Sequence, residues 1–142
     1  MNRNPTPSAS ETRRAKRVWW PVLAWAGFIF VLSSIPGNDF PEVPGRQTDK
    51  LVHAFLYGVL GVFSGRALAT GTSLAGARLV GATCLMAIGY GISDELHQLF
   101  TPRRSCDWHD VVADAVGGLL GGLVAEALVR RNRANRASRP KP

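Results

Sequence analysis

Ten side chains that could perform chemistry lie in two short clusters beside long apolar stretches. They comprise five carboxylates, with a lysine, an arginine, a histidine, a tyrosine and an amide among them: Asp49, Lys50, His53, Tyr57, Asp94, Glu95, Gln98, Arg104, Asp110 and Asp114. A histidine among carboxylates can serve acid–base catalysis or bind a cation. Ionisable groups at the edge of a membrane-length segment are costly to keep, so the clusters predict a functional site.

Four apolar segments separate and flank these clusters. Each has about 17 to 19 residues, near the minimum for a helix that crosses roughly 30 Å of hydrocarbon: 18–35, 51–69, 77–93 and 111–129. The first segment follows a basic stretch, as a signal peptide would, but it lacks a small-residue cleavage site. We therefore predict an all-α, polytopic membrane protein built as a bundle of four transmembrane helices.

The distribution of basic residues predicts the orientation of these helices. A basic tail at residues 1–17 and another at 130–142 flank the four-helix domain at 18–129. If both termini are cytoplasmic, thirteen of the seventeen Lys and Arg residues lie inside, as the positive-inside bias requires. We expect a multi-pass protein of the bacterial cytoplasmic membrane, with both tails cytoplasmic and in contact with membrane lipids. No nucleic-acid partner is expected, because no aromatic residues are interleaved with the basic ones.

Small and polar residues recur at four-residue spacing in three of the segments. Each set forms a stripe along one face of a helix, with polar residues toward the expected outer side and small residues below them. The three stripes are Asp49, His53, Tyr57, Gly61 and Gly65; Cys84, Ala87, Gly91, Glu95 and Gln98; and Asp110, Asp114, Gly117, Gly121 and Ala125. Small residues four apart allow membrane helices to approach closely. The stripes should therefore face one another and form a shallow polar crevice that opens outward.

Loop and capping signals complete the outer side. Prolines predict loops after the first and third segments, at Pro41–Gly45 and at Pro102. Thr48 or Asp49 is placed to cap the second helix and Asp107 to cap the fourth. Helix capping is therefore expected to be part of what these carboxylates do.

The ordered motifs of residues 31–122 resemble the VanZ-like membrane protein family. The matching positions are Ser34, Pro36, Asp49, Lys50, His53, Tyr57, Asp94, Glu95, Gln98, Pro102, Arg104, Ser105 and Asp110. Two positions depart from the family pattern: Asp114 replaces an asparagine and Arg103 replaces a glycine. The resemblance implies a link with low-level resistance to the lipoglycopeptide teicoplanin, within a family that has no agreed biochemical activity.

Several functions remain open for the clusters. They could form an ion-pair network that only locks the helices. They could instead bind a cationic group, a divalent metal or an envelope ligand, such as a cell-wall precursor or a glycopeptide, through Asp94, Glu95, Asp110 and Asp114. An enzyme that uses a histidine base, or two histidines and carboxylates around zinc or manganese, is a third reading. Proton transport is disfavoured because no carboxylate bridges Asp114 and Glu126. We assign no cofactor and no metal ligand from the sequence.

Overall fold

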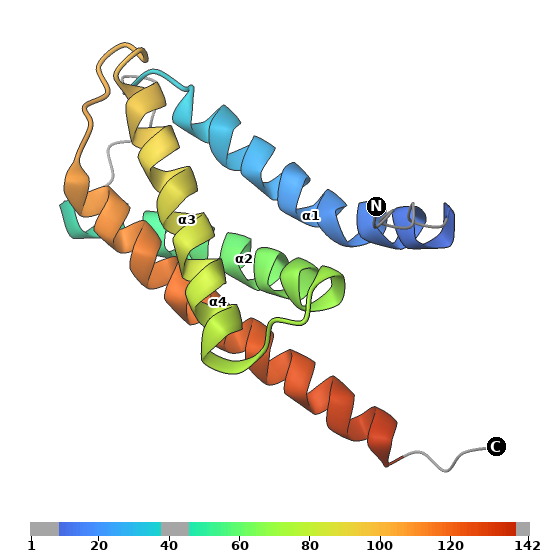
Figure 1. The fold of residues 1–142 in the computed structure, drawn as a ribbon. Coiled ribbons are helices and arrows are strands. Elements are labelled where there is room, and N and C mark those ends of the chain that lie inside the picture. Colours follow the sequence, from blue (N-terminus) through green and yellow to red (C-terminus); the bar gives the residue numbers. More distant parts are fainter. Residues whose placement is uncertain (1–8, 38–45, 139–142) are drawn as a thin grey trace, which may run out of the picture.

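The computed structural model describes residues 9–37 and 46–138, and these residues form four helices with no strand among them. The helices are α1 (Ala9–Ser33), α2 (Arg46–Gly71), α3 (Gly76–Gln98) and α4 (Trp108–Ala137) (Figure 1). The all-α prediction is confirmed. Each helix is longer than its apolar segment, since α1 begins and α4 ends in basic turns rich in alanine and arginine, which are good helix formers.

Three of the helices could cross a membrane. By length and composition, the spans within the described ranges are Thr48–Gly71, Gly76–Gln98 and Trp108–Ala137. The apolar part of α1, Arg17–Ser33, is shorter. Large apolar side chains nevertheless cover the outside of α1, with Leu23 and Val31 at least 60% exposed. Such surfaces suit a lipid environment rather than water.

The most extensive contact between two of the described helices joins α2 to α4, and glycines form much of it. A Cβ added at Gly121 would lie 2.9 Å from Gly61 Cα and from Val62 N, and one at Gly61 would lie 3.0 Å from Gly118 O. Only hydrogen fits in these positions, so the two backbones touch directly. The predicted pairing of the small stripes is therefore confirmed for α2 and α4.

Helix α3 packs on the other row of small residues along α4. A Cβ at Gly122 would lie 3.3 Å from Thr83 Cβ, and Gly118 faces Ala87 in the same way. Gly91, one turn above Ala87, faces the carboxylate of Asp114. The three helices α2, α3 and α4 thus form one closely packed unit.

Helix α1 joins this unit through fewer contacts. The indole N–H of Trp25 donates to the carbonyl of Leu56 at 2.8 Å, and the hydroxyl of Tyr90 donates to the carbonyl of Ala26 at 2.6 Å. A small apolar core also joins α1 to α2, and it includes Ile29. Helix α1 therefore rests on the side of the unit.

The four helices meet at one end, where α1 and α3 finish and α2 and α4 begin (Figure 1). We call this the polar end, and it contains all ten candidate residues. Asp107 caps α4 as predicted, since its side chain accepts from the N–H of His109. The capping prediction for α2 was wrong: α2 begins at Arg46, so Thr48 and Asp49 lie inside its first turn.

Candidate functional site

Lys50 connects the starts of α2 and α4. Its ammonium group donates to Asp107 Oδ2 at 2.8 Å and to Asp110 Oδ1, and it lies 4.0 Å from Asp49. The side chain of Asp110 is almost fully buried, whereas that of Asp49 is 55% exposed. Lys50 therefore neutralises carboxylates of α4 more than its neighbour on α2.

Sequence reasoning treated Asp107 only as a helix cap, and the structure gives it a second role. Besides Lys50, its carboxylate accepts from the backbone N–H of His109 at 3.0 Å and contacts the imidazole of His109 at 2.7 Å. The hydrogen bond from Lys50, followed by those from His109, holds the pKa of the Asp107 carboxyl well below its usual range. Asp107 is thus a permanent anion beside the site.

His53 and Asp114 form a buried pair one helical turn below Lys50. His53 Nδ1 lies 3.0 Å from Asp114 Oδ1, and the Asp114 side chain is 0% exposed. The second oxygen of Asp114 has no hydrogen-bond partner. Because the resemblance places an asparagine at this position, the aspartate adds a buried charge that His53 faces.

Glu95 links the end of α3 to the start of α4. Its Oε2 accepts from the backbone N–H of Asp107 at 2.7 Å, while Oε1 is buried without a partner. On the same helix, the amide of Gln98 lies 3.4 Å from Asp94 Oδ2, which is a weak hydrogen bond. Glu95 therefore helps to fix the register of Asp107 and Asp110.

Arg104 lies in the connection between α3 and α4 and reaches across to α1. Its Nε donates to the carbonyl of Ile35 at 3.3 Å. The neighbouring Arg103 has a φ of 57°, in the left-handed region that favours glycine. A glycine, which the resemblance places at position 103, would therefore adopt this backbone conformation without strain.

A small pocket of about 70 Å³ lies at the polar end between α1, α2 and α3. Its polar lining combines both charges with hydroxyl and amide groups: Ser33, Asp49, His53, Tyr57, Asp94, Gln98 and Arg104. The hydroxyls of Ser33 and Tyr57 are buried there and have no hydrogen-bond partner. Buried polar groups are almost always satisfied, so a water molecule or another bound molecule in the pocket would supply partners for these two hydroxyls.

The structure brings the ten predicted residues to one end of the bundle but divides them between separate contacts. Lys50 pairs with the start of α4, His53 pairs with Asp114, and Arg104 bonds a carbonyl of α1. Sequence reasoning missed Ser33. It drew attention to Ser34, which instead bonds the carbonyl of Phe30 and lies 3.0 Å from His97 Nε2.

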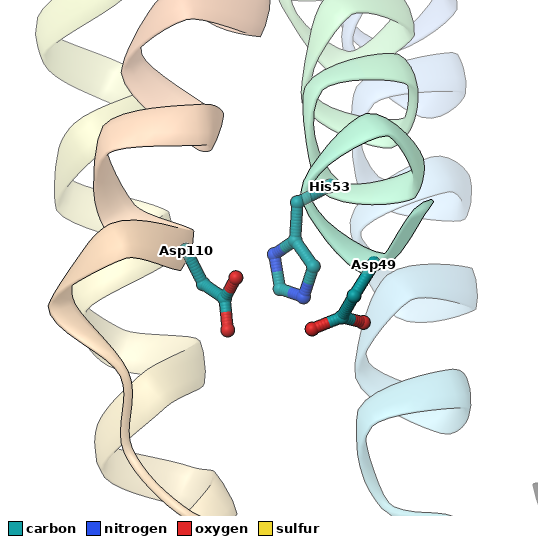
Figure 2. A group of neighbouring side chains, drawn as sticks. All are labelled: Asp49, His53 and Asp110. Carbon is teal, nitrogen blue, oxygen red and sulfur yellow. The ribbon is translucent and has the colours of Figure 1, made fainter. Parts of the chain in front are cut away.

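Three of the residues could hold a metal ion. Asp49, His53 and Asp110 each offer one ligand atom, and these atoms lie within 4.8 Å of one another. Figure 2 shows the imidazole between the two carboxylates, with His53 and Asp49 on α2 and Asp110 on α4. The group thus spans the contact between the two helices.

Comparison with known proteins agrees with this architecture. A family model described as VanZ/LLP1 matches residues 18–129, from the apolar part of α1 through most of α4. No curated protein and no solved structure matches the chain. The matched region covers the apolar helices and every candidate residue. The chain therefore belongs to the VanZ/LLP1 family, as a membrane protein of four helices.

Proposed function

We propose that this chain is a multi-pass protein of the bacterial cytoplasmic membrane, with four spans and both termini in the cytoplasm. Three helices have the length and composition of spans, and the exposed apolar side chains of α1 suit contact with lipid. The ends of the described chain both lie away from the polar end (Figure 1). With the basic tails inside, the polar end faces the outer side of the membrane.

Thiol labelling of intact cells tests this orientation. Cys106 is exposed at the polar end, whereas Cys84 lies half-buried within α3. Partial desolvation and the carboxylate of Glu95 raise the pKa of the Cys106 thiol, so labelling should be slow at neutral pH and faster near pH 8.5. A membrane-impermeant maleimide should label the protein from outside, and Cys106→Ser should abolish the signal. Labelling only after lysis would contradict the orientation.

The polar end serves, in this proposal, to bind a polar group of a cell-envelope molecule. The observation that carries it is the pocket with two buried, unpartnered hydroxyls among charged side chains. A purely structural network would be expected to satisfy those atoms internally. Binding of an envelope ligand would in turn support envelope homeostasis or tolerance to lipoglycopeptides.

The size of the pocket limits what it can hold. Its volume of about 70 Å³ is far below the roughly 300 Å³ at which pockets for drug-sized ligands begin. A whole lipoglycopeptide would not fit, but one amino or hydroxyl-bearing group would. Asp49 and Asp94 in the lining favour a cationic or hydroxyl-rich group. The ligand would therefore insert one end, such as the head group of a lipid-linked precursor, and leave its remainder outside.

Substitutions that remove only the unpartnered hydroxyls test this binding. Tyr57→Phe and Ser33→Ala break no hydrogen bond in the described structure. Ser64→Ala is the matched control, because its buried hydroxyl bonds the carbonyl of Leu60 within α2, outside the pocket. We expect the two pocket variants to lower teicoplanin tolerance at unchanged membrane abundance, and the control to leave tolerance unchanged at equal abundance.

Two results would contradict the proposal. The first is unchanged teicoplanin tolerance after deletion of the gene. The second is full tolerance in a Tyr57→Phe, Ser33→Ala double variant of normal abundance. A structural role for the charged residues would be favoured instead by a different result. In that case four variants would lose membrane abundance but keep normal tolerance per molecule: His53→Ala, Glu95→Ala, Arg104→Ala and Asp110→Ala.

A further inference from the structure

We propose that Asp49, His53 and Asp110 bind one divalent transition-metal ion between α2 and α4. Their ligand atoms lie within 4.8 Å of one another. Ligand atoms that each bind one ion at about 2.1 Å in tetrahedral geometry lie about 3.4 Å apart, so the three side chains would draw closer together to complete the site. The three side chains point into one space between the helices (Figure 2).

The hydrogen bond to Asp114 prepares His53 for this role. An ionised Asp114 can only accept, so the Nδ1 atom that lies 3.0 Å from it carries the hydrogen. The lone pair of Nε2 then remains for a metal ion. Metal-binding histidines commonly donate their other N–H to a carboxylate in this way, which fixes the ring and raises its basicity.

Tyr57, whose hydroxyl also supports the function proposed above, indicates that something binds beside this group. It lies one helical turn below His53, and the two rings are nearly parallel with centroids 6.3 Å apart. Its side chain is 0% exposed, its hydroxyl has no partner, and it lines the same pocket as Asp49 and His53. A water molecule or anion held by the metal ion would give this hydroxyl a partner.

The local charge also favours a cation. Within residues 46–138, the polar end carries six carboxylates, Asp49, Asp94, Glu95, Asp107, Asp110 and Asp114, against four basic residues, Arg46, Lys50, Arg103 and Arg104. A divalent ion would offset this excess of two negative charges. Lys50 does not exclude the ion, because Asp110 has two carboxylate oxygens and Lys50 contacts one of them.

The donor atoms define the class of metal. One imidazole and two carboxylates suit zinc or manganese, whereas soft ions prefer thiolates. Three protein ligands leave coordination positions open for water or for an oxygen of a bound molecule. His97, which faces Ser34, is not part of the group. The site thus needs one histidine, and it shares Asp49 and His53 with the pocket proposed above for the envelope ligand.

Metal titration of the purified protein tests the site directly. The full chain in detergent is stripped with a chelator and titrated with ZnCl₂ or MnCl₂, and bound metal is counted by mass spectrometry after dialysis. We expect one ion per chain. Asp49→Asn should weaken binding at least 10-fold, and because the Asp49 side chain is 55% exposed this variant should fold normally. His53→Ala should abolish binding.

Two further variants complete the design. Asp114→Asn should weaken binding by about 10- to 100-fold, as expected when the partner of a ligating histidine is lost. His109→Ala is the matched control, because this exposed histidine lies beside Asp107 outside the group. It should bind metal like the unaltered chain. Absence of stoichiometric metal, or equal binding by the Asp49→Asn, His53→Ala and unaltered chains, would overturn the proposal.

Discussion

The upper and lower halves of the α2–α4 contact are held together in different ways. In the lower half, Gly58, Gly61, Gly117 and Gly121 bring the two backbones together without side chains. In the upper half, the polar end, Lys50 joins Asp110 and His53 joins Asp114. In the lower half the glycines leave no room for a methyl group, whereas in the upper half buried polar atoms of Tyr57 and Asp114 have no partner. Helix packing explains the residues of the lower half, but it does not fully explain those of the upper half.

The largest effect is expected from closing the glycine contact. Gly121→Ala would place a methyl group 2.9 Å from Gly61 Cα and Val62 N, and neither backbone atom can move aside alone. We expect a loss of about 2–3 kcal/mol or more in unfolding free energy, and a marked fall in membrane abundance. Gly89→Ala is the matched control, because a Cβ there meets nothing within 4 Å. Equal abundance of both variants would show that the contact is not tight.

A smaller loss is expected from breaking the polar half. Lys50→Ala leaves the buried Asp110 without its cation, which should cost about 1–3 kcal/mol in unfolding free energy, measured by denaturation in detergent. Arg136→Ala is the control at the opposite end, because this exposed arginine forms no ion pair with a carboxylate in the described part of the chain. That change should cost less than about 0.5 kcal/mol. Restoration by Asp110→Asn in the Lys50→Ala background would identify the unpaired charge as the cause.

A gain in stability is expected from Arg103. Arg103→Gly removes an L side chain from the left-handed region, with a φ of 57°, and should raise the unfolding free energy by about 0.5–1 kcal/mol. Arg103→Ala separates this effect from loss of the side chain's charge, because alanine keeps the strained conformation. A gain with alanine equal to that with glycine would mean that charge, not backbone conformation, limits stability at this turn.

The smallest effect concerns the pH dependence of the Asp107 cap. Because its pKa is lowered in the folded protein, its stabilising contribution is complete above the unfolded value of about 3.9 and is lost as pH falls toward the folded value. Asp107→Asn should therefore lower the Tm by about 2–4 °C at pH 7. The difference from the unaltered chain should shrink below about pH 4. A constant difference across this range would exclude the carboxylate charge as its source.

Four-residue spacing predicted much of this molecule. It placed His53 and Tyr57 on one face of α2, and it placed Asp114 above the glycines of α4, as the structure has them. Helix periodicity is a local property, so the face of a helix on which each residue lies can be predicted from that segment alone. The family resemblance added the order of the motifs, and the family match supports it.

The partners across helices could not be predicted in this way. Whether Lys50 meets Asp107 or Asp110 depends on how far α2 is shifted along α4, and spacing within one helix does not contain that shift. The choice between Ser33 and Ser34 depends in the same way on the rotation of α1. The sequence also did not identify Asp49, His53 and Asp110 as one group, because these residues come from two helices and match no local ligand spacing.

Helix α1 contributes to only one of the two proposed sites, although both sites include Asp49 and His53. Ser33 and Ile29 on α1 form one wall of the polar pocket, while the three metal ligands all come from α2 and α4. A lipid head group could thus enter the pocket from the side if α1 alone moved away. The ion would keep all three of its ligands during that movement. Weakening the Trp25 bond to Leu56 should accordingly change ligand exchange and spare metal affinity.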